Sequence, residues 1–214
     1  LGVDLEARDE GGHTAVMYAA ASGHTDTVKA LAELGVDLDA RDEDGWTPVM
    51  YAAFQRHTDT VVALAKHGAN LEAKDDRERT SVMHAAFQGH TDTVKALAEL
   101  GVHLEARDED GWTPVMYAAA RGHTDTVEVL EELIAKRAAK AKLSKMRIEE
   151  KKSEYRKTQV QSKRLKKQIS GVVIADEIAK KIREGKEKRA ITRKVGKELR
   201  QEIMIERYGQ KDGK

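Results

Sequence analysis

A chain of 214 residues is long enough for one or two domains, and 40% hydrophobic residues provide enough apolar side chains for a core. The absence of cysteine excludes a disulfide framework and thiolate metal sites. No apolar run approaches the roughly 20 residues of a membrane helix and no secretory signal is visible in the sequence, so we expect an intracellular, cytoplasmic protein.

The formal net charge of +1 hides two oppositely charged halves. Residues 1–134 contain 11 Lys and Arg against 26 Asp and Glu, a net charge of −15. Residues 135–214 contain 27 against 11, a net charge of +16. The sequence therefore predicts an acidic domain over 1–134, followed by a basic tail that we divide into 135–170 and 171–214.

The acidic half repeats itself every 33 residues, beginning with the threonines Thr14, Thr47, Thr80 and Thr113. Each copy continues with Val-Met-x-Ala-Ala, then His-Thr-Asp-Thr-Val and a leucine-bearing segment. A fixed period of 20 to 50 residues is typical of one structural unit stacked on copies of itself. The repeats span about 12–44, 45–77, 78–110 and 111–134. Because Leu1 corresponds to Leu34 in the middle of a repeat, we expect the chain to be a piece of a longer protein.

Each repeat predicts two helices and a turn-rich loop. The first helix, Thr47–Phe54 in the second copy, carries alanines that let neighbouring helices approach closely. The second helix begins near Thr58, which we expect to be its N-cap residue, and Asp59 favours the positive end of the helix dipole. Glycines such as Gly68 are expected to end these second helices. The acidic "ARDEDG" segments then form solvated hairpin tips.

This unit resembles the ankyrin repeat. The residues that match the family motif in the second copy are Thr47, Pro48, Val49, Met50, Ala52 and Ala53. Further landmarks of the family match Gly23-His24, Val28, Leu31 and Gly35. The resemblance covers residues 1 to about 134, and it implies an all-α solenoid of paired helices with hairpin-like loops.

One departure from the family is systematic, because Met stands where these repeats usually have His. The four residues are Met17, Met50, Met83 and Met116. Since Met cannot donate the hydrogen bond that such a His makes, we expect packing to tie the first helix to the hairpin instead.

The resemblance also implies a partner-binding face. The family commonly directs toward its ligand the position before the motif Thr and the two positions after Ala-Ala. The residues so placed include His13, Trp46, Arg79, Trp112, Phe54, Gln55, Phe87, Gln88 and Arg121. Trp and Arg dominate binding hot spots, so we expect a protein partner here. Two interpretations of the aromatic residues stay open: contact with the partner, or a cover over the neighbouring repeat.

No pattern in the repeats predicts chemistry. The Asp42–Gly45 segment begins like a calcium loop, but Tyr51 stands where such a loop needs a bidentate acid. The histidines His24, His57, His90 and His123 recur without the paired spacing of a zinc site, and His84 is interpreted as a substitution for the Tyr of the other copies. We therefore predict no metal, no cofactor and no catalytic residue.

The basic tail begins as a long helix. No Gly or Pro interrupts the chain from Val127 to Ser170-Gly171, where we expect the helix to end. An apolar period of seven runs through Ile134, Ala141, Ile148, Tyr155, Ser162 and Ile169. The companion row is too polar to establish a coiled coil, since it consists of Ala138, Lys145, Lys152, Gln159 and Lys166.

After the long helix we expect a short C-terminal helical segment or hairpin. Val172–Ile174 is expected to be extended, Asp176 to cap a short helix, and Gly185 to interrupt it before a last amphipathic helix over Ile191–Ile203. The order of these elements resembles the C-terminal part of phage small terminase subunits, through "SGVVIADEI" and the helix before it.

The sequence thus favours a non-catalytic protein–protein interaction module or scaffold, whose repeat groove binds a protein partner and whose basic tail docks on a larger assembly. One alternative is nucleic-acid binding through residues 135–214. Another is self-assembly into an oligomer, in which the basic tail of one chain contacts the acidic face of a second. Contact of the tail with anionic lipid is a further possibility, although no strongly amphipathic basic helix with Trp or Phe supports it.

Overall fold

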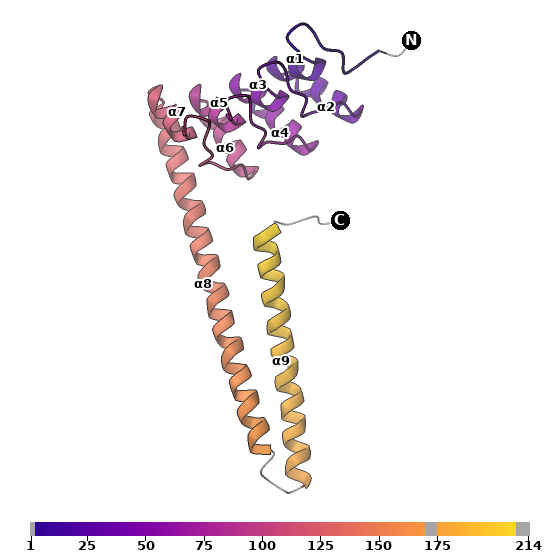
Figure 1. Cartoon of the computed structure of the whole chain (residues 1–214), viewed down its shortest axis with the longest axis vertical. Helices are drawn as coiled ribbons and strands as arrows, with labels where there is room; N and C mark the ends of the chain where they lie inside the picture. The colour runs from indigo at the N-terminus through magenta and orange to yellow at the C-terminus, as the bar shows by residue number, and fades with distance from the viewer. Residues whose placement is uncertain (1–2, 170–174, 209–214) are drawn as a thin grey trace. The chain divides into compact units, whose positions relative to one another are not determined.

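The computed structural model describes the backbone of residues 3–169 and 175–208 and the side chains of 3–164 and 183–201, and all regular structure in these ranges is helical. The all-α solenoid predicted from the sequence is therefore confirmed (Figure 1). The chain divides into two compact units, Leu1–Arg137 and Ala138–Lys214. The helices are α1 (Ala15–Ala21), α2 (Thr25–Glu33), α3 (Pro48–Phe54), α4 (Thr58–Lys66), α5 (Ser81–Phe87), α6 (Thr91–Glu99), α7 (Pro114–Ala120), α8 (Thr124–Ile169) and α9 (Ala175–Tyr208).

The helix boundaries of the repeats follow from local chemistry. α3 begins at Pro48, since a proline at the first helical position gives up an N–H that would have no partner. The second helices end as predicted at glycines in the left-handed region, such as Gly68 with φ 92°. The predicted N-cap was wrong, because the N-cap residue of α4 is His57. The hydroxyl of Thr58 instead lies 2.8 Å from that of Thr93 in the next repeat.

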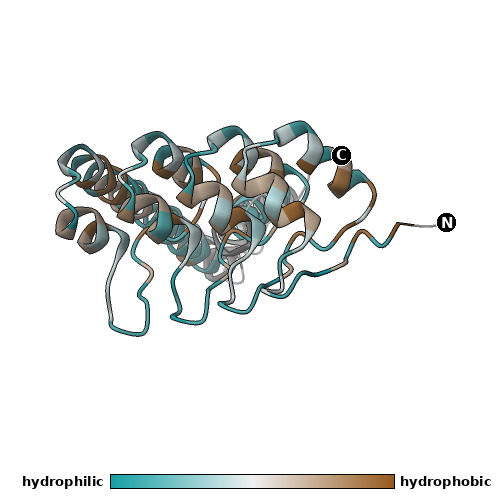
Figure 2. Cartoon of the chain, turned by 90° about the horizontal axis from the view of Figure 1, so that it is seen from above, coloured by the Kyte–Doolittle hydropathy of each residue, from teal (hydrophilic) through white to brown (hydrophobic). Residues whose placement is uncertain are grey.

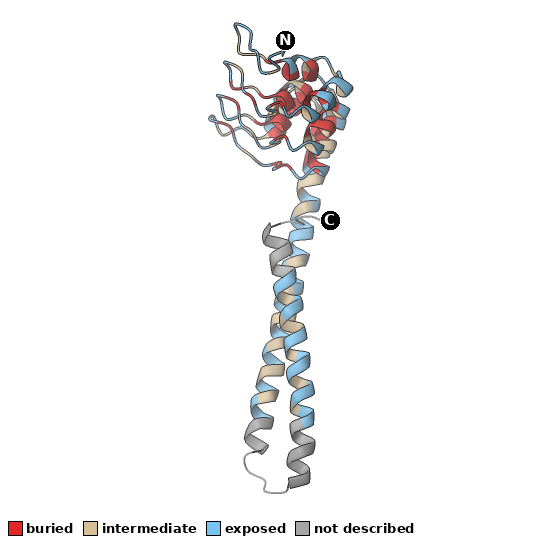
Figure 3. Cartoon of the chain, turned by 90° about the vertical axis from the view of Figure 1, so that its right-hand side faces the viewer, coloured by how far each residue is buried: buried red, intermediate tan, exposed pale blue. Residues whose placement is uncertain are grey.

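The core of the first unit lies between the helices of successive repeats, where Figure 3 shows the buried residues gathered. Alanines such as Ala53 and Ala86 are completely buried, so the first helices pack closely. Met83 is 1% exposed, whereas the equivalent Met116 in the last repeat is 48% exposed. This difference shows that each repeat covers the apolar face of the one before it.

The loops that connect the repeats form a row of fingers, residues 3–13, 35–46, 68–79 and 101–112, which project from one side of the helices (Figure 2). Adjacent fingers are joined near their tips by backbone hydrogen bonds, from Asp76 N to Asp44 O (3.2 Å) and from Glu109 N to Arg77 O (3.2 Å). The fingers therefore form a continuous surface in which residues about 33 apart are neighbours.

The second unit consists of the later part of α8 and of α9, and its described side chains include none that is fully buried. Figure 3 shows only intermediate and exposed residues along this part. The less exposed face of α8 includes Ser144, Ile148, Lys151, Tyr155, Thr158 and Ser162. The predicted stripe through 148, 155 and 162 is thus on this face. Of the polar companion row, Lys152 and Gln159 are also partly buried, while Ala138 and Lys145 are exposed.

The expected break at Gly185 was wrong, because α9 runs without interruption from Ala175 to Tyr208. A helical glycine costs only about 1 kcal/mol relative to Ala, and the strong helix formers around Gly185 outweigh that cost. The C-terminal helix is therefore long rather than short. The extended segment expected at 172–174 lies outside the described residues.

Neither α8 nor α9 is apolar enough to cross a membrane, and no other helix in the described part of the chain is long enough.

Candidate partner-binding face

One aspartate organises each finger. Asp42 Oδ1 accepts hydrogen bonds from the backbone N–H groups of Asp44 (3.0 Å) and Trp46 (2.8 Å). The same pair of bonds recurs in every repeat and fixes the residue before the motif threonine. The four aspartates, which we call the aspartate clasp, are Asp9, Asp42, Asp75 and Asp108, and they hold the backbone of His13, Trp46, Arg79 and Trp112. The clasp thus positions the first row of predicted binding residues.

The other carboxylate oxygen of each clasp residue ties the finger to the first helix. The hydroxyls of Tyr18, Tyr51 and Tyr117 donate to it in three repeats. In the third repeat His84 Nε2 lies 3.1 Å from Asp75 Oδ2, so His84 does take the place of a Tyr.

Two expectations are corrected by the clasp. Packing was expected to tie the first helix to the hairpin. Instead, the Tyr or His that follows each Met forms a hydrogen bond with the clasp aspartate. The acids of the ARDEDG segments were expected to be solvated. Glu43, Asp44, Glu109 and Asp110 are exposed, but Asp108 is only 6% exposed because its carboxylate is used inside the finger.

The charge state of the clasp follows from these bonds. Burial raises the pKa of Asp75, but hydrogen bonds from His84 and from the backbone and side chain of Arg79 outweigh it and lower the pKa to about 2. Burial also lowers the pKa of His84, an effect that its bond to Asp75 only partly offsets. Burial and the bond to Asp42 raise the pKa of Tyr51. At neutral pH Asp75 is therefore ionised, while the rings of His84 and Tyr51 are neutral.

A groove of about 480 Å³ lies between the second and third repeats. It is lined by Asp44, Trp46, Tyr51, Phe54, Gln55, Asp76, Arg77 and Arg79. Four residues of the predicted face, Trp46, Phe54, Gln55 and Arg79, therefore come together. The Trp46 ring also lies 4.1 Å from the ring of His84 in the next repeat, measured between centroids, so Trp46 lines the groove and covers its neighbour as well.

A second cluster joins the third and fourth repeats. The rings of Phe87 and Tyr117 meet edge to face at 6.0 Å, and the ring of Trp112 lies 5.4 Å from Tyr117. The guanidinium carbon of Arg121 lies 4.5 Å from the centre of the Phe87 ring, in a cation–π contact. Trp112 is 40% exposed. Three further predicted residues, Phe87, Trp112 and Arg121, are thus neighbours on the same face.

The last two predicted residues lie apart from these clusters. His13 Nε2 lies 3.1 Å from the Tyr51 hydroxyl, which places His13 beside the groove but outside its lining. Gln88 is half-buried, and it lines neither the groove nor the Phe87 cluster.

Sequence reasoning missed Tyr51, Asp44, Asp76 and Arg77 as groove residues. The tyrosine was considered only as the residue that rules out a calcium loop, and the acids were assigned to solvent. The signal that could have identified the clasp is the constant separation of nine residues between the aspartate and the Tyr or His in all four repeats.

The row of histidines before the second helices has a structural role. His57, His90 and His123 place Nε2 at 3.1, 2.9 and 3.1 Å from the backbone carbonyl oxygens of Ala21, Phe54 and Phe87 in the preceding repeats. Within the described residues, no group of three His, Cys, Asp or Glu side chains is arranged to hold a metal ion.

Comparison with protein families gives one match. A family model of ankyrin repeats in three copies matches residues 1–75 and 71–140. Nothing in the comparison supports the resemblance of the tail to terminase subunits, which lies beyond the matched residues. The search of curated protein sequences found no match.

Proposed function

Because the chain belongs to the ankyrin-repeat family, whose repeats are in general non-catalytic protein–protein interaction modules, we propose that its finger side binds a protein partner. The observation that carries this proposal is the groove in which Trp46, Phe54, Gln55 and Arg79 meet. A concave site with aromatic walls and a few charged groups is typical of binding sites.

The chemistry of the face suggests a partner with basic side chains around an apolar anchor. Residues 1–137 contain 13 Lys and Arg against 26 Asp and Glu, so the unit is strongly acidic. Such a field attracts positively charged partners and raises their association rate. Trp46 and Phe54 offer apolar contact for a side chain that enters the groove. Asp44 also lines the groove and can receive a cation, while Asp76 already pairs with Arg41.

Peptides selected from a displayed random library against the full chain test this proposal. The selected peptides are expected to be basic and to lose at least tenfold in affinity toward Trp112→Ala/Arg121→Ala, because aromatic and Arg anchors dominate such interfaces. We choose this pair because Trp112 is exposed and its removal leaves the core intact. Trp46→Ala is the second variant, and thermal unfolding separates its loss of binding from its loss of packing on His84.

The matched control is Lys29→Ala/Lys66→Ala on the second helices α2 and α4. Both lysines line a shallow hollow away from the fingers. Peptides that lose affinity for this control, and keep it for Trp112→Ala/Arg121→Ala, would contradict the proposal.

We also propose that the basic unit attaches the repeats to a larger assembly, since residues 138–214 contain 25 Lys and Arg against 11 Asp and Glu. The repeat unit has its own core, so residues 1–137 are expected to fold alone and to bind the selected peptides as the full chain does. A loss of peptide binding in this shortened chain would show that the second unit belongs to the binding face.

A further inference from the structure

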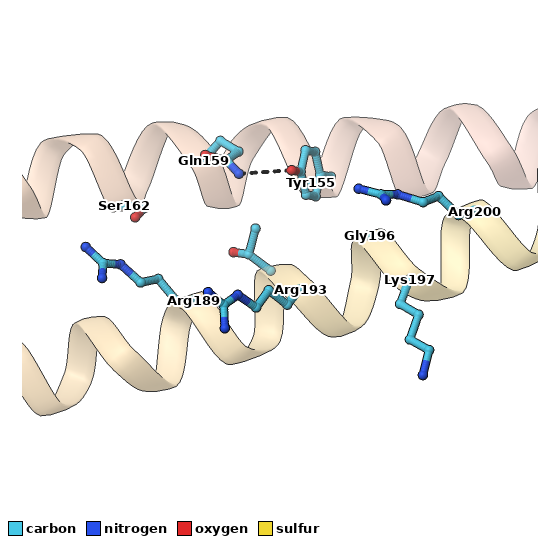
Figure 4. Close-up of a pocket in the computed structure, with 9 residues that line it drawn as sticks. Tyr155, Gln159, Ser162, Arg189, Arg193, Gly196, Lys197 and Arg200 are labelled. Atoms are coloured by element: carbon cyan, nitrogen blue, oxygen red, sulfur yellow. Dashed lines mark hydrogen bonds between the residues drawn. The ribbon is translucent and has the colours of Figure 1, made fainter.

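The helical unit contains a basic groove between its two helices (Figure 4). Its volume is about 510 Å³. The lining consists of Tyr155, Gln159 and Ser162 from α8 with Arg189, Thr192, Arg193, Gly196, Lys197 and Arg200 from α9. No acidic residue belongs to this lining.

The four cations of the groove have no acidic partner among the side chains that the structure describes. Arg189, Arg193, Lys197 and Arg200 are exposed, and none forms an ion pair with a side chain that the structure describes. In contrast, Lys152 on α8 pairs with Glu149 at 2.7 Å. Like charges held along one helix repel each other, so an arrangement of this kind favours an external polyanion.

The spacing of these cations suits a phosphate backbone. They recur every three or four residues, and the 11 residues from Arg189 to Arg200 rise about 16 Å at 1.5 Å per residue. A nucleic-acid strand places one phosphate about every 3.4 Å along the axis of a duplex. The four cations therefore extend over a length that corresponds to about five phosphates.

The other lining residues also favour nucleic acid. Arg binds phosphate through paired N–H donors, and hydroxyl and amide groups like those of Ser162, Thr192 and Gln159 commonly contact phosphate. The Tyr155 ring packs against Gly196, where an added Cβ would lie 3.6 Å from the ring. This aromatic side chain is of the kind on which bases stack.

A protein or a lipid surface fits this groove less well. Interfaces between proteins have an apolar centre, but the lining contains no aliphatic side chain. Membrane-surface helices need apolar residues beside the basic ones. The exposed Ile191 of α9 is two residues from Arg189 and from Arg193, about 200° around the helix, so it points to another side.

We propose that this groove binds the phosphodiester backbone of nucleic acid through Arg189, Arg193, Lys197 and Arg200. The proposal names the partner of the helical unit and rests on its proposed attaching role. It is independent of the partner of the repeats, because the groove belongs to the second unit alone.

Fluorescence anisotropy of the full chain tests the site, with labelled oligonucleotides of about 20 nucleotides, as single-stranded DNA, single-stranded RNA and duplex DNA. For four neutralised phosphates, the logarithm of the association constant for a single strand should fall against the logarithm of the salt concentration with a slope of about −3. Affinity then drops roughly 50-fold between about 50 and 200 mM salt. Comparing the three oligonucleotides shows which form of the backbone is preferred.

The test variant is Arg189→Gln/Arg193→Gln, which removes two groove cations. It should weaken binding at low salt at least tenfold and halve the slope. The matched control is Arg183→Gln/Lys194→Gln, which removes the same charge from α9 outside the groove lining and should change affinity less than threefold. Circular dichroism confirms that both variants keep their helix content.

Four results would overturn the proposal. Equal losses in the two variants would show diffuse attraction rather than a site, and no binding at low salt would exclude nucleic acid altogether. Phosphatidylserine vesicles that bind when oligonucleotides do not would assign the groove to lipid. The fourth result is a salt-sensitive oligomer that binds no oligonucleotide and that only Arg189→Gln/Arg193→Gln abolishes. That result would assign the groove to the acidic unit of a second copy. The last two results would leave the attaching role in place, whereas loss of every form of association would remove that role as well.

Discussion

Substituting Asp75 with Asn should destabilise the repeat unit by about 2.5 kcal/mol at pH 7. Asp75 has no exposed side-chain area and accepts from the backbone of Arg77 and Arg79, from the Arg79 side chain and from His84. The folded protein lowers its pKa from the ordinary 3.8 to about 2. Each pKa unit corresponds to about 1.36 kcal/mol of preference for the ionised form, so about two units give the expected loss.

The same reasoning fixes the pH dependence. Because the folded pKa is lowered, the contribution of Asp75 is fully present above the unfolded value near 4 and is lost as the pH falls toward about 2. The difference in unfolding free energy between the wild type and Asp75→Asn should therefore shrink from about 2.5 kcal/mol at pH 7 to about 1 kcal/mol at pH 3. Urea unfolding followed by circular dichroism measures both differences.

The neighbouring Asp76 provides the control. Its side chain is 61% exposed and pairs with Arg41 at 2.8 Å on the surface, and exposed pairs contribute less than about 1 kcal/mol. If Asp75→Asn cost no more than Asp76→Asn at pH 7, or if its cost were the same at pH 3, the clasp would not hold an ionised carboxylate as argued.

Two further predictions concern the repeats, and urea unfolding at pH 7 measures both. The buried Thr80 Oγ1 has no hydrogen-bond partner among the described atoms. Met83→His should therefore raise the unfolding free energy by about 1 kcal/mol, because the His supplies a donor. A lower unfolding free energy in this variant would mean that the packing of Met83 matters more. Gly23→Ala should lower the unfolding free energy by at least about 1 kcal/mol more than Gly35→Ala does. Both glycines have positive φ, but only at Gly23 would an added Cβ clash with a side chain, the ring of His57. Equal losses in the two variants would show that the ring moves aside freely.

The sequence predicts the repeat helices well because their signals are local. The 33-residue period, the His-Thr-Asp segment and glycines such as Gly68 identify where each second helix begins and ends. The same signals do not reveal the clasp. It depends on an acid and a ring nine residues apart meeting across a turn, and an aspartate in a polar loop looks solvated until that geometry is known.

The tail was harder to predict because its helices lack contrast between apolar and polar faces. In α8 the partly buried residues include Ser144, Lys151 and Thr158, and no hydrophobic pattern distinguishes them from exposed neighbours such as Lys145. Gly185 suggested a break in α9 that the structure does not show, since helix propensity is a local preference that flanking helix formers can override. Of the candidate groove, the sequence predicted the lining residues Trp46, Phe54, Gln55 and Arg79 but not Tyr51, Asp44, Asp76 and Arg77.

The two units differ in how their folding relates to binding. The repeat unit buries a continuous apolar core, so its face is formed before any partner arrives, and binding there requires little rearrangement. The helical unit shows no fully buried side chain in its described part, and α9 brings four unpaired cations together along the groove. A ligand that binds only the folded form stabilises it, and a polyanion in the groove would also remove the repulsion between those cations. If a polyanion occupies the groove as proposed, we expect the stability of the helical unit to rise with ligand concentration more strongly than that of the repeats.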